Sequence, residues 1–442
     1  MQSSPRVKYN LLSFDGGGMR GYGSMLILER LMRYVRDIEG DAKCLADLLK
    51  DVPDANCDPA ESSFHPHDCP AGIEGSAMNE EVNKFLPCHY FDCIIGTSTG
   101  GLIAMMLGRL RMTVTHARQQ YQLLGQQVFG SPRSFPYLSF RPLAIIKYNH
   151  EGLVKAVKDI IQHHDSIQEG PYGFPNASFN KTDYGVCSTV VTALGKVYDS
   201  QWSPIKTNEN EEMNEVNYRF QTYDTPEETN SGDPNLGTAF TGPLWWVARA
   251  CTAAPTYFIP KEIEALNGNI WRFKDAGLVF KTQLKRALMR SYAGVPHLKL
   301  IKAGFKFDNP EAVHKNMSRT LGVNGIYWRF NGDSHEWGNI KLDQYDEGTM
   351  TKMRTLANTY LAREDVKHDL QECAKSLVKH RRQRLKQQDA WERFALAVEY
   401  RCAAPGCFNH YNLKEDMENH MRRCHRGNQE KAKRLIWRYD RS

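Results

Sequence analysis

Short apolar segments near the start of the chain are each followed by a glycine-rich turn and then by apolar residues at helical spacing. Residues 7–14 predict a strand, and residues 24–38 predict a helix because their apolar positions recur every three or four residues. Residues 89–95 and then 101–110 repeat this order of strand, turn and helix. The repetition favours an α/β fold, in which helices cover both faces of a sheet.

The same patterns continue beyond this unit. Residues 41–87 are rich in Pro, Asp, Ser and Gly, and we expect a surface insertion there. Further strands are predicted at residues 184–198, 216–223 and 270–273, and further helices at residues 153–161 and 244–255.

The sequence becomes helical in pattern and strongly charged after about residue 345, and this change predicts a domain boundary. Residues 1–345 would form the catalytic domain, and residues 346–398, which are helical in pattern and strongly charged, a basic helical linker. Residues 399–427 would form a small separate module, and residues 428–442 a basic tail.

Composition narrows the class of protein. The 442 residues, with 41% hydrophobic and 24% charged residues, suit a globular protein with a sizeable core. We expect no secretion signal and no membrane-spanning segment at the start or along the chain. The 11 cysteines are an odd number and are scattered, which favours reduced thiols and a cytoplasmic or nuclear location, with contact to a membrane surface left open.

The first motif with chemical content is Asp15-Gly16-Gly17-Gly18-Met19-Arg20-Gly21, between the first strand and helix. Consecutive glycines let several backbone N–H groups converge on one anion, which is what the oxyanion of an acyl-transfer reaction needs. The spacing also fits a dinucleotide-binding turn, but the acidic residue that such a turn expects at the end of a second strand is missing. The oxyanion interpretation is therefore preferred.

The second motif is Gly96-Thr97-Ser98-Thr99-Gly100, between the second strand and its helix. A serine is a weak nucleophile unless it is held exposed on a sharp turn and given a base. The third motif, Asp275-Ala276-Gly277, follows a predicted strand and offers a carboxylate as that base. Together the three motifs indicate a serine hydrolase.

The order of these motifs and their flanking residues resemble the patatin-like phospholipases over residues 7–300. The flanks that carry the resemblance are Tyr90 to Ile95 before the nucleophile, Gly101 to Ala104 after it, and Ala250 to Phe258 before the aspartate. The resemblance implies an α/β/α sandwich and a lipid acyl hydrolase that works through an acyl-enzyme and needs no cofactor for this step.

Residue by residue, the resemblance implies that Ser98 is the nucleophile and Asp275 the base of a dyad without histidine. It also implies an oxyanion hole made by Gly16, Gly17 and Gly18 with Arg20. The sequence departs from the family at Ala276, where the family commonly has glycine. If that position required a positive φ, alanine would be strained there.

Two other functions are kept as alternatives. An α/β-hydrolase with a Ser-His-acid triad would need a late histidine, for which His297, His314 and His335 are candidates. A catalytically degenerate zinc-finger adaptor is the second alternative, which the intact motifs disfavour.

The C-terminal module has the spacing of a zinc site. Cys402 and Cys407 are followed by His420 and then by either His425 or Cys424, which resembles the zinc finger of the two-Cys, two-His type. Four such ligands would bind a structural zinc ion. A protein partner is a better expectation than nucleic acid, because a single finger spans only about three base pairs.

The basic residues 379–386 allow two interpretations. They can form a solvated helix face, or they can attract anionic lipid headgroups, which would suit a lipid substrate at a membrane surface.

Overall fold

The computed structural model covers the whole chain and describes most of its regular elements. The described residues are 9–51, 85–130, 132, 137–138, 145–164, 177–180, 187–204, 206–208, 211–212, 215–223, 239–255, 257–265, 268–276, 298–303, 314, 318, 327–332, 335–384, 398–401, 407, 410–411, 420–425 and 433–436. No helix within these residues is long and apolar enough to cross a membrane.

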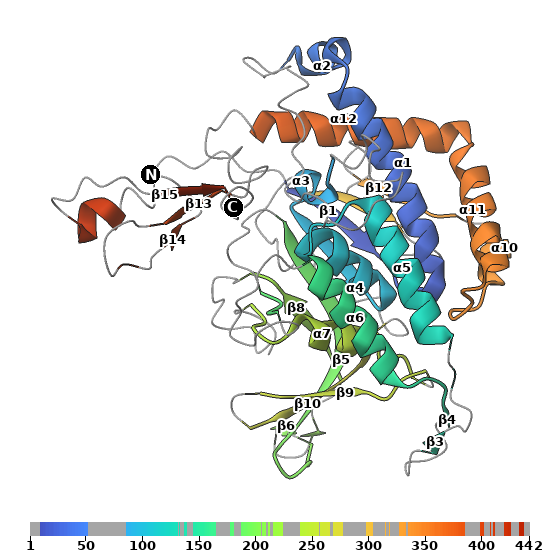
Figure 1. The fold of residues 1–442 in the computed structure, drawn as a ribbon, viewed down its shortest axis with the longest axis vertical. Coiled ribbons are helices and arrows are strands. Elements are labelled where there is room, and N and C mark those ends of the chain that lie inside the picture. Colours follow the sequence, from blue (N-terminus) through green and yellow to red (C-terminus); the bar gives the residue numbers. More distant parts are fainter. Residues whose placement is uncertain are drawn as a thin grey trace.

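A mixed β-sheet of eight strands forms the centre of the molecule (Figure 1). Its main path runs β12-β11-β1-β2-β5-β10-β9, and β8 pairs with β5 outside that path. Four of these strands are β1 (Tyr9–Phe14), β2 (Cys93–Thr97), β11 (Leu298–Ala303) and β12 (Tyr327–Phe330), which pair in parallel. The α/β class expected from the sequence is confirmed by this sheet and its helices.

The long strand β5 (Ser188–Tyr198) organises the other half of the sheet. Its first half pairs in parallel with β2, and its second half pairs antiparallel with β10 (Ile270–Asp275). Strand β8 (Val216–Gln221) pairs with Val190–Gly195 and so overlaps both. Since a strand has only two edges, β8 occupies one edge, and β2 and β10 share the other.

The carboxyl ends of β2 and β10 therefore meet head-on along one edge of β5. Thr97 lies opposite Thr192, and Asp275 lies opposite the next residue, Ala193. The residue after β2 is Ser98, so the sheet register brings the second and third motifs together.

The first strand-turn-helix units agree with the sequence in type and differ in detail. Helix α1 (Gly21–Glu39) begins directly after the glycine turn, and α4 (Thr99–Ala104) begins after Ser98 and continues into a π-helical turn, Met105–Arg109. The strand predicted at residues 89–95 is wrong in its first part, because Pro87 starts a single helical turn, α3 (Pro87–Tyr90).

The surface insertion expected at residues 41–87 also needs correction in its first part. Helix α2 (Ala42–Leu49) forms there, capped by the Asp41 side chain, and buries Leu45 and Leu49 against the core. Residues 52–84 lie outside the described part of the chain.

The remaining helices lie around the sheet. They are α5 (Val114–Phe129), α6 (His150–His164), α7 (Leu244–Cys251), α10 (His335–Gly338), α11 (Glu347–Leu361) and α12 (Glu364–Arg384). Strand β9 (Lys261–Glu264) pairs with β10, and the short strands β3 (Tyr137–Leu138), β4 (Ile145–Ile146), β6 (Lys206–Asn208) and β7 (Glu211–Glu212) form two small hairpins.

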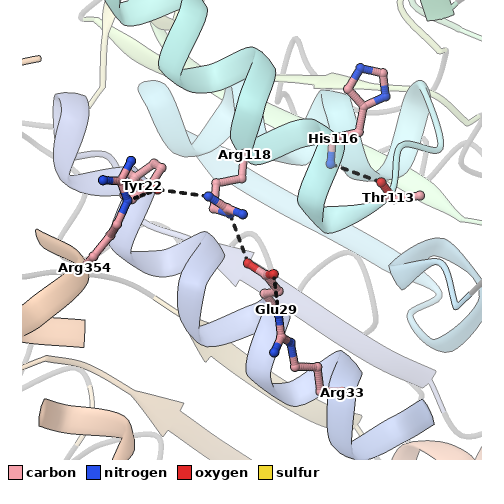
Figure 2. A network of polar contacts seen from close by, with 7 residues as sticks. All are labelled: Tyr22, Glu29, Arg33, Thr113, His116, Arg118 and Arg354. Atoms are coloured by element: carbon pink, nitrogen blue, oxygen red, sulfur yellow. Dashed lines mark hydrogen bonds and ion pairs between the residues drawn. The ribbon is translucent and has the colours of Figure 1, made fainter. Parts of the chain in front are cut away.

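Polar contacts join α1, α5 and α11 (Figure 2). Glu29 on α1 accepts hydrogen bonds from Arg118 on α5 at 3.0 Å and from Arg33 at 3.1 Å. Arg118 and Arg354 on α11 both donate to the hydroxyl of Tyr22, at 2.9 and 3.1 Å. Helix α11 is thereby tied to the first helix of the fold although it lies beyond the predicted domain boundary.

Helix α12 packs against α1 and crosses it near one end (Figure 1). A buried ion network joins the two helices. The carboxylate of Glu39 on α1 is fully buried and accepts from Arg382 at 2.7 Å, while Arg381 lies 3.5 Å away. The Tyr90 hydroxyl also donates to Glu39, at 2.9 Å. A charge removed from water in this way needs such partners.

This packing corrects two expectations. Residues 347–378 contribute buried apolar side chains to the same core as α1, so the segment up to residue 384 is not a linker beside that core. Arg381 and Arg382 are 4% and 2% exposed, so they form neither a solvated face nor a lipid-binding surface. Residues 385–397 lie outside the described part of the chain.

The C-terminal module contains a three-stranded sheet. Strand β13 (Val398–Arg401) pairs antiparallel with β14 (His410–Tyr411) on one side and with β15 (Lys433–Ile436) on the other. Residues 420–424 are helical. Strand β15 falls within residues 428–442, which the sequence led us to expect as a basic tail.

Candidate active site

Ser98 stands on a strained turn between β2 and α4. Its backbone has φ 56° and ψ −132°, a conformation that non-glycine residues rarely adopt. The turn is closed by neighbouring backbone, because a Cβ on Gly96 would lie 2.0 Å from the Gly100 oxygen and a Cβ on Gly100 would lie 2.6 Å from the Asp15 oxygen. Glycine at both positions is therefore a steric requirement.

Asp275 lies within hydrogen-bond distance of this serine. The Ser98 Oγ donates to Asp275 Oδ2 at 2.5 Å, across a sequence separation of 177 residues. Ser98 and Asp275 are 8% and 7% exposed, so the pair is largely shielded from water. The Asp275 N–H donates to the Ala253 oxygen at 3.0 Å, which fixes the end of β10.

Ala276 does not carry the strain considered from the sequence. Among the described residues, the non-glycine positions with positive φ are Ser98, Arg111 and Trp202. Ala276 is fully buried beside Asp275. Alanine therefore fits its position, and Gly277 lies outside the described residues.

The glycine loop lies directly against the serine. A Cβ on Gly16 would come within 2.5 Å of Ser98 Cβ and 3.1 Å of its Oγ. Within the described part of the chain, the N–H groups of Gly16 and Gly18 have no protein acceptor, whereas the Gly17 N–H donates to Thr99 Oγ1 at 3.2 Å. Two of the three predicted glycine N–H groups thus lack a protein acceptor among the described residues, and one of them belongs to Gly16, which lies against Ser98.

Arg20, the fourth predicted member of the oxyanion hole, is 7% exposed in the turn that precedes α1. Burial lowers the pKa of its guanidinium, while the neighbouring Tyr257 raises it. Arginine remains a cation at neutral pH, so Arg20 contributes positive potential to this part of the molecule.

The glycine loop packs against Leu342, and the sequence analysis assigned neither this residue nor its neighbour Asp343 to the site. The Leu342 carbonyl accepts from the Met19 N–H at 2.8 Å, and Gly18, at φ +56°, packs so closely on it that a Cβ would lie 2.1 Å from that oxygen. Asp343 is 8% exposed and accepts from Tyr148 at 2.8 Å and from Lys147. A backbone carbonyl leaves no sequence signal, so this contact becomes visible only in the fold.

Cys251, at the end of α7, is a second neighbour that the sequence analysis did not assign. Its thiol is fully buried and lies within hydrogen-bond distance of two carbonyl oxygens, that of Ala248 at 3.3 Å and that of Ser98 at 3.5 Å. Burial, and after it the charge of Asp275, raise the pKa of Cys251 well above its ordinary value. The thiol is thus a neutral packing group beneath the serine and not a thiolate nucleophile.

The histidines of the alternative triad have other neighbours. His314 lies 3.3 Å from both the Tyr327 hydroxyl and Ser318 Oγ, and His335 lies 3.3 Å from the Asn339 side chain. His297 lies outside the described residues. Among the described residues, the Ser98 hydroxyl is hydrogen-bonded to the Asp275 carboxylate.

Three of the predicted zinc ligands lie close together in the C-terminal module. The ligand atoms of Cys407, His420 and His425 are within 4.8 Å of one another, and Cys407 Sγ lies 3.3 Å from His420 Nε2. Ordinary zinc bond lengths in a tetrahedral site separate sulfur from nitrogen by roughly 3.5 Å, so the donor set fits this ion. Cys424 is exposed and outside the group, and Cys402 lies outside the described residues.

Fold and site together define an α/β protein with a serine and a carboxylate paired at the end of a central strand. Residues 76–288 match the model of the family described as patatin-like phospholipase, and this match includes Ser98 and Asp275. No curated protein matches the chain. Among solved structures, the chain is similar to the crystal structure of VipD from Legionella pneumophila, with 10% identity, 81% of this chain and 68% of that chain covered, and a TM-score of 0.28.

Proposed function

We propose that this protein is a lipid acyl hydrolase that cleaves carboxylic esters of phospholipids or related glycerolipids through an acyl-enzyme. The observation that carries the proposal is the 2.5 Å contact between Ser98 Oγ and Asp275 Oδ2 on a strained turn beside the glycine loop. The match of residues 76–288 to the patatin-like phospholipase family supports a lipid ester as substrate.

In the first half of the reaction, Ser98 Oγ attacks the ester carbonyl carbon while Asp275 accepts the hydroxyl proton. The N–H groups of Gly16 and Gly18, aided by the charge of Arg20, stabilise the oxyanion of the tetrahedral intermediate. Collapse of this intermediate breaks the ester bond, and Asp275 returns the proton to the leaving alcohol. In the second half, Asp275 deprotonates water, which attacks the acyl-enzyme and releases the fatty acid and Ser98.

Fluorophosphonate labelling and ester hydrolysis test the proposal together. The wild-type protein should be labelled at Ser98, and Ser98→Ala should abolish both labelling and hydrolysis of a phospholipid. Asp275→Asn should lower hydrolysis at least about 10³-fold, since the base and its charge are lost. His335→Asn is the matched control and should retain activity, since this side chain contacts Asn339.

Two outcomes would overturn this assignment. Absence of labelling in the folded wild-type protein would favour a degenerate adaptor. Retention of activity in Asp275→Asn, with loss in a histidine variant, would favour the triad of an α/β-hydrolase.

For the C-terminal module we propose a structural zinc ion held by Cys402, Cys407, His420 and His425. The grouping of three of these ligands supports it, and the exposure of Cys424 favours His425 as the fourth ligand. The metal would hold β13 and β14 against the residues 420–424 helix, leaving a surface for a protein partner. Zinc binding needs Cys402 and Cys407 as reduced cysteines, which suits a cytoplasmic or nuclear location.

Metal content of the purified full chain tests this site. We expect about one zinc per chain by inductively coupled plasma mass spectrometry, retained in Cys424→Ser and lost in His420→Gln. Loss of zinc in Cys424→Ser, with retention in His425→Gln, would identify Cys424 and not His425 as the fourth ligand. Zinc-free wild-type protein that keeps its fold would overturn the site.

A further inference from the structure

A cavity of about 680 Å³ lies beside α6, α7 and β9 and is separate from the serine and aspartate described above. Its walls are formed by the α6 residues 150–162, the start and last turn of α7, and residues 259–262. The cationic residues among them are Lys155, Lys158, Arg249 and Lys261. Nothing in the proposed ester chemistry uses this cavity.

Arg249 is the buried cation in the cavity wall. Its side chain is 2% exposed, and its Nη2 donates to the Ile259 carbonyl. Its Nε and Nη1 are buried and have no hydrogen-bond partner within the described part of the chain. The Phe258 ring, 5.7 Å from the guanidinium carbon, stabilises the charge in part.

A guanidinium with two unused N–H-bearing nitrogens is costly to bury, because it has lost water without gaining an acceptor. Burial lowers the pKa of Arg249 to about 10. Such a group calls for an anion that the described residues do not supply.

Two lysines lie at the same cavity. Burial, and after it the charge of Arg249, lower the pKa of Lys261, so these two cations lie near enough to repel each other. The ammonium nitrogens of Lys158 and Lys261 lie 4.7 Å and 5.4 Å from the centre of the Trp245 ring, so both cations lie close to one aromatic side chain. Mutual repulsion of this kind is relieved when an anion binds between the cations.

The acidic residues of the cavity wall lie at its edges and have partners of their own. Glu262 is exposed and lies 3.9 Å from Arg272 on the neighbouring strand. Glu151 is exposed and accepts from Asn149 at 2.8 Å. Asp159, on α6, is partly exposed and also has a partner. None of these carboxylates is hydrogen-bonded to Arg249, so the buried guanidinium is not neutralised by them.

We propose that this cavity is a phosphate-binding site, with Arg249 at its base and Lys158 and Lys261 at its sides. A phosphate offers several acceptor oxygens, which match the unused Nε and Nη1 of the guanidinium and the two ammonium groups. The phosphate can belong to a lipid headgroup or to a soluble molecule, and the cavity recognises the chemistry that the two share.

Calorimetric titration of inorganic phosphate into the full-length Ser98→Ala protein tests the site without interference from hydrolysis. We expect saturable binding at constant ionic strength and at least about tenfold weaker binding in Lys158→Gln/Lys261→Gln, which keeps Arg249 and the packing around it. Lys367→Gln, an exposed residue paired with Glu364 on α12, is the matched control and should bind like the parent.

Vesicles distinguish the two sources of phosphate. Phosphatidylcholine vesicles with and without phosphatidic acid are sedimented with the same proteins. Binding that requires phosphatidic acid, is lost in the double variant and is displaced by inorganic phosphate would identify a lipid headgroup. Calorimetric binding of phosphate without this vesicle binding would identify a soluble ligand. Equal phosphate and vesicle binding by parent and double variant, or no binding in either assay, would overturn the proposal.

Discussion

Replacement of Gly16 by alanine is a direct test of how closely the glycine loop approaches the nucleophile. The new Cβ would lie 2.5 Å from Ser98 Cβ, whereas ordinary contact begins near 3.4 Å. The loop or the serine must therefore move by roughly 1 Å, and a displacement of this size at a reacting group can cost about 10²-fold in rate. We expect Gly16→Ala to lower kcat/KM for a soluble ester by about 10²-fold.

Gly17→Ala is the matched control for this variant. A Cβ on Gly17 would meet Arg20 Cβ at an ordinary 3.6 Å, so an alanine side chain has room there. The substitution also keeps the Gly17 N–H. We expect activity within about threefold of wild type, about 0.7 kcal/mol in activation free energy.

The assay compares initial rates of ester hydrolysis, with thermal unfolding of each variant as the check on folding. Equal loss in the two folded variants would refute the steric argument. Full activity in Gly16→Ala would show that the loop does not lie against the serine during catalysis.

Three further predictions concern the surroundings of the site. Glu39→Gln should lower the free energy of unfolding by about 3–5 kcal/mol, measured by urea denaturation, because it leaves the two arginines of α12 buried without a counter-charge. Burial alone would raise the pKa of Asp343, but the hydrogen bonds from Lys147 and Tyr148 hold this pKa below its ordinary value of 3.8. The ionised carboxylate therefore stabilises the fold above pH 3.8, and this contribution is lost as the pH falls through the lowered pKa. Asp343→Asn should therefore cost about 1 kcal/mol at pH 7 and less at pH 3, and an equal loss at both would contradict the linkage. Iodoacetamide at pH 8 should modify the exposed Cys424 and spare the buried Cys251, as read by peptide mass spectrometry, and rapid modification of Cys251 in the folded protein would contradict its raised pKa.

Local patterns in the sequence were sufficient for the strand-turn-helix units and for the candidate residues in them. The glycines around Ser98 and in the loop at Gly16 could be recognised from the sequence as turn residues, and the structure shows that a Cβ would clash at Gly16, Gly96 and Gly100. The sequence also placed a carboxylate at the end of a strand. The distance between that carboxylate and the serine could not be predicted, because it depends on the register of β5.

Long-range partners account for what the sequence did not predict. The charged residues 379–386 look solvated because nothing local neutralises them, yet Arg381 and Arg382 are buried against Glu39, which lies more than 300 positions earlier. The carbonyl of Leu342 has no side-chain signature at all. The apolar pattern before β2 did not distinguish a strand from the helical turn that Pro87 starts.

Helix α7 contacts both the turn that carries Ser98 and the cationic cavity. Cys251 contacts the Ser98 carbonyl, and Arg249, two residues earlier, lines the cationic cavity. Residues two apart on a helix point to nearly opposite sides, so α7 separates Ser98 from the cavity while packing against both. An anion at Arg249 would therefore bind to the same helix that contacts the Ser98 turn, and it would do so without entering the space in which we propose that the ester is cleaved.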